Sequence, residues 1–146
     1  MGTRRKSREL ALQALYQGEL AGPAGVLDFA EFCAHFQLNR KAMPYAKKLL
    51  EGVLGKREEI NQLISRYAEN WRLERMSVID RNILRLAVFE LHYLDDVPAS
   101  VAINEAVEIA KRYSTDDSGP FINGILDAMV KEVVSGDGDR AKSARW

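Results

Sequence analysis

Residues 97–113 read Val-Pro-Ala-Ser-Val-Ala-Ile-Asn-Glu-Ala-Val-Glu-Ile-Ala-Lys-Arg-Tyr, and residues 114–127 read Ser-Thr-Asp-Asp-Ser-Gly-Pro-Phe-Ile-Asn-Gly-Ile-Leu-Asp. The two stretches predict a helix, a tight polar turn and a second helix, because each helix would open with a proline in its first turn. Asp117 or Ser118 would cap the second helix. Neither stretch holds a histidine, a cysteine or a glycine-rich phosphate loop. The polar turn therefore indicates a binding surface rather than a catalytic centre.

The rest of the chain has the same helical periodicity, since apolar residues recur three and four positions apart in almost every window. We expect helices at residues 5–20, 27–38, 43–67, 77–94, 98–113 and 117–134. A breaker, Ala-Gly-Pro-Ala-Gly at 21–25, and a link at 69–76 divide these helices into two halves. The predicted fold is all-α, a single-domain bundle of about six to seven helices arranged as two helical subdomains. This domain would span residues 1–134, and the glycine- and charge-rich residues 135–146 would form a disordered tail.

The expected helices contain Gly52, Gly55, Asn123 and Gly124, where a structural role would account for them. Gly52 and Gly55 would each weaken their helix by about 1 kcal/mol relative to alanine, unless they let two helices approach closely. In the last helix, we expect the Asn123 amide to satisfy a buried turn and Gly124 to give room for close packing.

Composition bounds the class of protein. The chain has 146 residues, enough for one domain with a sizeable core, and its 21 basic and 21 acidic residues cancel. A single cysteine, Cys33, excludes an intramolecular disulfide and fits a reducing compartment. Neither a signal peptide nor an apolar run of the ~20 residues that a membrane helix needs is visible. We therefore expect a cytoplasmic protein that makes no membrane contact.

Positive charge gathers at the N-terminal edge, where Arg4, Arg5, Lys6 and Arg8 precede the first acidic residue. At 100° per residue, Tyr16 lies about 20° from Arg5 around the helix axis, and Arg8 lies within about 60° of the same line. These three side chains would form an outward strip. The opposite side would face the core through Leu10, Ala11, Ala14, Leu15 and Gly18. Guanidinium groups bind phosphates and tyrosine stacks on unpaired bases, so the strip suits single-stranded RNA. The alternative is an ordinary solvated basic terminus.

Nothing in the sequence favours catalysis. The only histidines, His35 and His92, are far apart, and each is expected to be a packing or surface residue. Cys33 lies on the apolar side of its expected helix. Phosphate-loop, dinucleotide-binding and zinc-helix motifs are absent from the sequence. We expect a protein that is not an enzyme and holds neither a cofactor nor a metal.

Several of these stretches resemble the NusB family of bacterial transcription antitermination factors, which are small all-helical RNA-binding proteins. The resemblance rests on the amino-acid sequences at 71–87, 97–106 and 117–124 and on Gln-Ala-Leu-Tyr at 13–16. It covers roughly residues 4–134 and is weakest over 21–70.

The resemblance implies that the protein binds boxA, a short single-stranded element of ribosomal RNA leaders, and joins an antitermination complex on RNA polymerase. Lys6 would act as a point charge, Asp117 would accept hydrogen bonds from base edges, and Phe121 would offer a stacking surface. Phe121 has an equally plain interpretation as a core residue. The residues that the family pattern assigns to RNA are Arg4, Arg5, Lys6, Arg8, Tyr16, Asp117 and Phe121.

The family also binds NusE, a small-subunit ribosomal protein, and the matching acidic residues here are Glu74 and Asp80. Asp80 forms a capping-box-like pattern with Ser77 at the start of its helix. The plain alternative is that the charged residues of this segment pair four positions apart on a solvated face. These are the arginines at 66, 72, 75, 81 and 85 and the acids at 69, 74, 80, 90 and 95.

Two other functions stay open at this point. One is a helical protein–protein adaptor whose basic terminus is incidental. The other follows from the resemblance, because the fold also occurs as the RNA-binding module of some ribosomal RNA cytosine methyltransferases, where a catalytic domain follows. This sequence ends at Trp146, so we expect the stand-alone factor. The family includes monomers and homodimers, and the sequence does not rank them.

Overall fold

The computed structural model describes residues 2–21, 40–68 and 72–137. Its helices are α1 (Thr3–Ala21), α3 (Met43–Gly55), α4 (Arg57–Tyr67), η1 (Leu73–Arg75), α5 (Val78–Tyr93), α6 (Ala99–Tyr113) and α7 (Ser118–Asp137). The described residues contain no strand, and the predicted all-α fold is confirmed. The expected helix at 27–38, with Cys33 and His35, lies outside the described residues.

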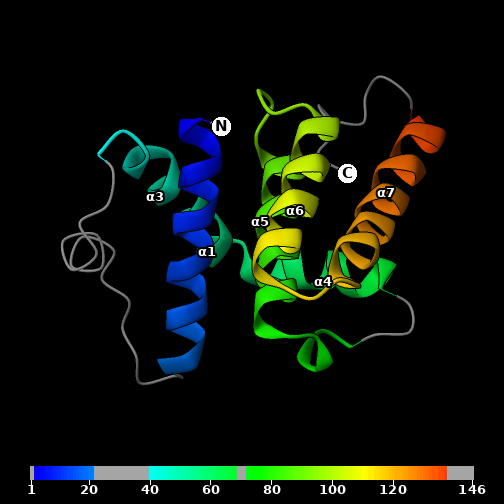
Figure 1. Cartoon of the computed structure of the whole chain (residues 1–146). Coiled ribbons are helices and arrows are strands. Elements are labelled where there is room, and N and C mark those ends of the chain that lie inside the picture. Colours follow the sequence, from blue (N-terminus) through cyan, green and yellow to red (C-terminus); the bar gives the residue numbers. More distant parts are fainter. Residues whose placement is uncertain (1, 22–39, 69–71, 138–146) are drawn as a thin grey trace.

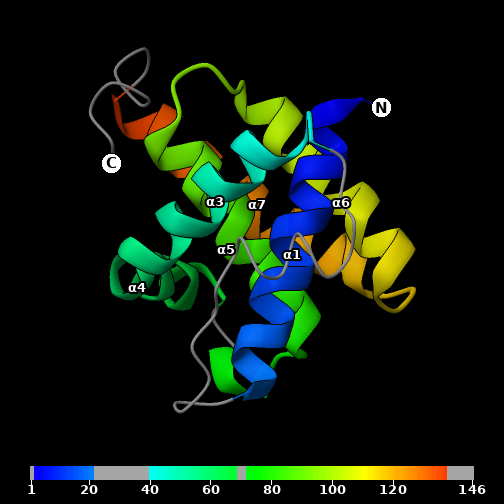
Figure 2. The same cartoon turned by 90° about the vertical axis from the view of Figure 1, so that its left-hand side faces the viewer.

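Helix α5 is the central element of the bundle. It contacts α1, α3, α4, α6 and α7, and α1 and α3 lie side by side on one side of it (Figure 1). From the side, α1 crosses in front of α5, between α3 and α6 (Figure 2). Helix α4 belongs to the first half of the sequence but packs against α5 and α7 of the second half. The two halves therefore share one core, to which the six α-helices contribute, for example, Leu12, Leu49, Ile64, Leu84, Ala106 and Leu126.

The central position of α5 leaves every residue from Asn82 to His92 buried. Most of these side chains are apolar, and leucine, isoleucine and phenylalanine gain about 1.5–3 kcal/mol each when fully buried. Arg85 and Glu90 are buried with them. Burying a charge is costly unless it is paired, so these two side chains require partners from the surrounding helices.

The predicted single helix at 43–67 is wrong, because the chain breaks between α3 and α4 at Lys56, whose φ of −116° and ψ of 22° are not helical. Gly52 allows close packing as expected: a Cβ there would overlap the Phe89 ring. A Cβ at Gly55, the last residue of α3, would meet open space. Gly55 therefore lies at the helix break rather than at a helix contact.

The ends of the later helices largely agree with the sequence pattern. Ser77 Oγ accepts a hydrogen bond from the Asp80 backbone N–H at 3.0 Å and caps α5. Helix α7 runs past Val134 to Asp137, and the rest of the segment expected to be a disordered tail lies outside the described residues. Asn123 is exposed and a Cβ at Gly124 would meet open space, so neither has the predicted packing role. None of the described helices is long and apolar enough to cross a bilayer.

Candidate nucleic-acid interface

The basic residues of the N-terminal edge lie on the first two turns of α1 and differ sharply in exposure. Arg4 and Lys6 are exposed, and Arg5 is half-buried. The side chain of Arg8 is only 6% exposed. Tyr16, three turns on from Arg5, is exposed as predicted.

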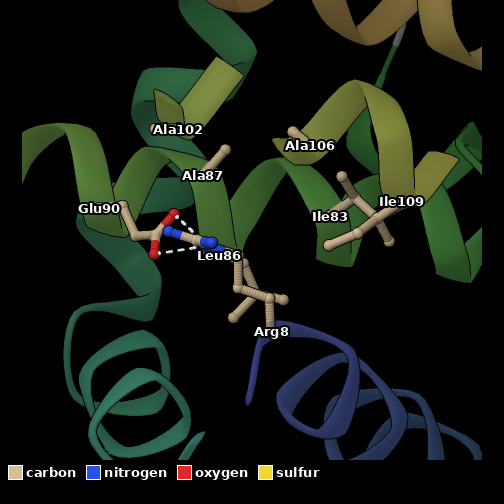
Figure 3. Close-up of a pocket in the computed structure, with 8 residues that line it drawn as sticks. All are labelled: Arg8, Ile83, Leu86, Ala87, Glu90, Ala102, Ala106 and Ile109. Atoms are coloured by element: carbon tan, nitrogen blue, oxygen red, sulfur yellow. Dashed lines mark hydrogen bonds and ion pairs between the residues drawn. The ribbon is translucent and has the colours of Figure 1, made fainter. Parts of the chain in front are cut away.

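The predicted outward orientation of Arg8 is wrong. Its Nε lies 2.9 Å from Glu90 Oε2 and 3.1 Å from Glu90 Oε1, and Figure 3 shows the side chain reaching from α1 to α5. Tyr45 of α3 donates a further hydrogen bond to Glu90. Arg8 and Glu90 are among the residues that line a pocket of about 10 Å³ between α1, α5 and α6, which has room for no more than about one water molecule.

The error has a physical cause. Helix α1 contacts both α3 and α5, so the covered part of its circumference is wider than a single core-facing stripe. Leu10, Ala11, Ala14 and Leu15 are buried as predicted, but so is Leu12, which lies on the side of Arg8. A residue about 60° from the exposed line is therefore still inside the covered arc.

Arg4 and Arg5 are also engaged with acidic residues. Arg5 donates from Nε and Nη2 to the two oxygens of Glu105 on α6, both at 2.8 Å. Arg4 Nη2 lies 3.1 Å from Asp96 Oδ2, and Arg4 Cζ lies 4.1 Å from the centre of the Tyr45 ring. The bidentate geometry is the one that a phosphate would use, so Glu105 occupies the edge of the Arg5 guanidinium through which Arg5 would bind a phosphate.

These contacts shift the ionisation of the acidic partners in opposite directions. The hydrogen bonds from Arg5 lower the pKa of Glu105 below its ordinary value, against a smaller opposing effect of burial. Burial raises the pKa of Glu90, and the nearby charge of Arg8 only partly offsets it. The half-exposed pair is therefore a fixed ionic contact, whereas the interior pair carries a desolvation cost.

Asp117 and Phe121 lie together at the turn between α6 and α7. Both line a surface pocket of about 270 Å³, in which Asp117 is exposed and Phe121 is half-buried. Phe121 also packs against the core. It is therefore a core residue, as its alternative interpretation held, and part of its ring remains at the surface. The other residues that line the pocket are Arg75, Met76, Ser77, Asp80, Thr115 and Ser118.

The two acidic residues assigned to NusE differ in their surroundings. Glu74 is exposed on η1. The carboxylate of Asp80 accepts hydrogen bonds from Ser114 Oγ at 2.6 Å and Ser118 Oγ at 2.9 Å. Asp80 therefore ties the start of α5 to the α6–α7 turn, and the hydroxyl of Ser118 is directed to Asp80.

A second ionic cluster was not foreseen from the sequence. Glu19, near the end of α1, accepts hydrogen bonds from Arg81, Asn82 and Arg85 of α5, and Arg85 also donates to Asn61 of α4 at 2.9 Å. Arg81 and Arg85 therefore pair across helices, not four positions apart as the plain interpretation of this segment held. Burial raises the pKa of Glu19, but the bonds from Arg81 and Asn82 outweigh it and the net pKa is lowered.

Comparison with known proteins assigns this arrangement to a family. The sequence profile of the NusB family matches residues 5–131. The chain belongs to the NusB family. It is 49% identical over 143 residues to the transcription antitermination protein NusB of Desulfosudis oleivorans, with 95% of this chain and 92% of the relative covered.

Solved structures agree with this assignment. A crystal structure of T. maritima NusB is 42% identical, with a TM-score of 0.77 and coverage of 88% of this chain and 91% of that one. A crystal structure of the antitermination factors NusB and NusE in complex with double-stranded RNA is 32% identical, with a TM-score of 0.78, and covers 89% and 97% of the two chains. Most of the candidate residues of this NusB-family chain lie inside the matched range, and their individual roles stay predictions.

Proposed function

We propose that this protein is a transcription antitermination factor that binds boxA-type single-stranded RNA together with ribosomal protein NusE and so promotes processive ribosomal RNA transcription. The observation that carries the proposal is the likeness, over 89% of this chain, to the NusB chain of a complex that holds NusE and RNA. The RNA of that complex is double-stranded, so single- and double-stranded forms of boxA need to be compared.

The RNA surface would run along α1 to the α6–α7 turn. Arg4, Arg5 and Lys6 would meet phosphates, Tyr16 would stack on a base, and Asp117 and Phe121 would bind at the turn. Arg8 would support this surface from the interior through Glu90, without touching RNA. Because Arg4 and Arg5 already have acidic partners, the gain from each phosphate contact is reduced. A partner that binds RNA at the same time would then supply the missing affinity.

The NusE surface would include Glu74 of η1 and the neighbouring start of α5. Glu74 is exposed and available to a basic partner. Asp80 would act mainly through Ser114 and Ser118, because its carboxylate already accepts hydrogen bonds from both. Charge reversal of Glu74 is expected to weaken NusE binding with no loss of fold, whereas Asp80→Ala is expected also to lower the melting temperature.

The proposal requires no catalysis. Among the described residues, histidine, cysteine and acidic side chains form no group of three that could hold a metal ion. Binding of RNA and NusE would place the protein in an antitermination complex on RNA polymerase in the cytoplasm. A homodimer that covered α1 would compete with RNA, and sedimentation with and without RNA would detect it.

Transcription in vitro tests the proposal. Bacterial RNA polymerase, NusE and the other antitermination factors would transcribe a template with boxA ahead of a terminator, with and without this protein. We expect added protein to increase read-through on the boxA template and not on one with a permuted boxA. Equal read-through on both templates would contradict the proposal and favour the protein–protein adaptor.

A further inference from the structure

Glu9 of α1 joins two cations from different helices. Its carboxylate lies 3.9 Å from Lys6 Nζ and 2.7 Å from Arg112 Nη1 of α6. Glu9 itself is almost inaccessible, with 7% of its side chain exposed. One buried carboxylate thus holds a lysine and an arginine on the same edge of the molecule, between α1 and the end of α6.

Both cations remain open to solvent. The Lys6 side chain is 57% exposed and that of Arg112 is 63% exposed, in contrast to Arg8 at 6%. Among the contacts of the described residues, Arg112 uses one guanidinium nitrogen for Glu9, whereas Arg5 uses two for Glu105. The edge of the Arg112 guanidinium away from Glu9 can therefore accept a second anion without breaking the existing pair.

An exposed aromatic ring adjoins Arg112. Tyr113 is exposed, and the Arg112 guanidinium carbon lies 6.0 Å from its ring centre. Burial of the hydroxyl raises the pKa of Tyr113, and the charge of Glu9 adds to the effect. A neutral phenol ring beside an exposed guanidinium is the combination that binds a nucleotide through its base and its phosphate.

We propose that Arg112 and Tyr113 of α6 are RNA contacts, Arg112 on a phosphate and Tyr113 stacked on an unpaired base. This inference rests on the proposed function and extends its RNA surface from α1 onto α6. The position favours RNA over a protein partner, because α6 ends here and leads directly into the turn that holds Asp117 and Phe121. The two residues would link the basic edge of α1 to that turn in one track.

The alternative is that Arg112 only holds α6 against α1. Arg112 is 63% exposed but its partner Glu9 is buried, and Lys6 stays near Glu9 when Arg112 is removed. Arg112→Ala is therefore expected to stay folded with a modest loss of stability, and melting temperatures of all variants check this. Lys131→Ala is the matched control, because Lys131 is an exposed helical cation with a carboxylate partner, Asp127, on α7.

The experiment measures affinity for fluorescent single-stranded boxA RNA in the presence of NusE at two salt concentrations. We expect Arg112→Ala to weaken binding about tenfold and to reduce the salt slope by about 0.7, the value for one phosphate on a single strand. Tyr113→Ala is expected to weaken binding about tenfold. Tyr113→Phe, which keeps the ring, and Lys131→Ala are expected to bind as the wild type does.

The outcomes separate this inference from the proposed function. If the wild type binds boxA RNA and both Arg112→Ala and Tyr113→Ala bind it equally well, the inference is overturned and the proposed function stands. Variants that lose NusE binding in the absence of RNA, with unchanged RNA affinity, would also overturn it and indicate a protein contact. A wild-type protein that does not bind boxA RNA with NusE would overturn both.

Discussion

Arg8 of α1 and Glu90 of α5 form an ion pair in the interior of the protein, 2.9 Å apart, with 6% and 2% of their side chains exposed. The pair joins the first helix to the central helix, and Tyr45 of α3 completes it. A basic segment that reads from the sequence as a uniform RNA-binding edge therefore has two parts. Arg8 serves the fold, whereas Arg4, Arg5 and Lys6 have side chains that are 49%, 34% and 57% exposed.

The first prediction concerns this interior pair. Arg8→Ala leaves Glu90 buried without its cation, and we predict a loss of about 3 kcal/mol in the free energy of unfolding. Arg4→Ala removes an exposed pair with Asp96 and is the matched control, with a loss of about 1 kcal/mol or less. Urea denaturation measures both. Equal losses for the two variants would contradict the assignment of Arg8 to the fold.

The second prediction concerns competition between Glu105 and RNA for Arg5. Glu105→Gln removes the anion that occupies the Arg5 guanidinium, so we predict that affinity for boxA RNA rises about twofold to fivefold. Lys131→Ala again serves as the unaffected control. A weaker affinity in Glu105→Gln would mean that Glu105 orients Arg5 for RNA rather than competing with it.

The third prediction concerns pH and Glu19. Its folded pKa is lowered below the unfolded value, so the unfolded state binds the proton more readily. The stabilising contribution is then complete above about pH 4.3, the ordinary value for glutamate, and is lost as pH falls through the folded pKa. We predict that Glu19→Gln flattens this acid limb of stability, measured as urea midpoints from pH 3 to pH 7. A limb of unchanged steepness would refute the role of Glu19.

The fourth prediction compares two glycines of α3. Gly52→Ala places a methyl group against the Phe89 ring, and we predict a loss of about 1–3 kcal/mol in unfolding free energy. Gly55→Ala meets open space and reduces the freedom of the unfolded chain, so a gain of about 0.4–1 kcal/mol is expected. Thermal and urea unfolding of the two variants would show opposite signs. A neutral Gly52→Ala would mean that α3 and α5 separate easily.

Local sequence pattern predicted most of the helices but not the partners of the interior charges. The proline and cap signals predicted the starts of the last two helices to within one residue, at Ala99 and Ser118, because those signals act within one turn. The partners of Arg5, Arg8 and Glu19 lie far along the chain, where spacing carries no information. The orientation of Arg8 depends on how much of the surface of α1 is covered by the neighbouring helices. The break between α3 and α4 depends on the backbone angles of a single residue, Lys56. Nothing in its own helix marks Arg112, and its contact with Glu9 joins residues that are far apart in the sequence.

The most direct measurement is the affinity of boxA RNA for this protein with and without NusE, against an RNA of permuted sequence. The account predicts that NusE tightens binding of the single-stranded boxA RNA, that the permuted RNA binds more weakly, and that the salt slope corresponds to only a few phosphates. Binding that is the same for both RNAs and unaffected by NusE would contradict the account.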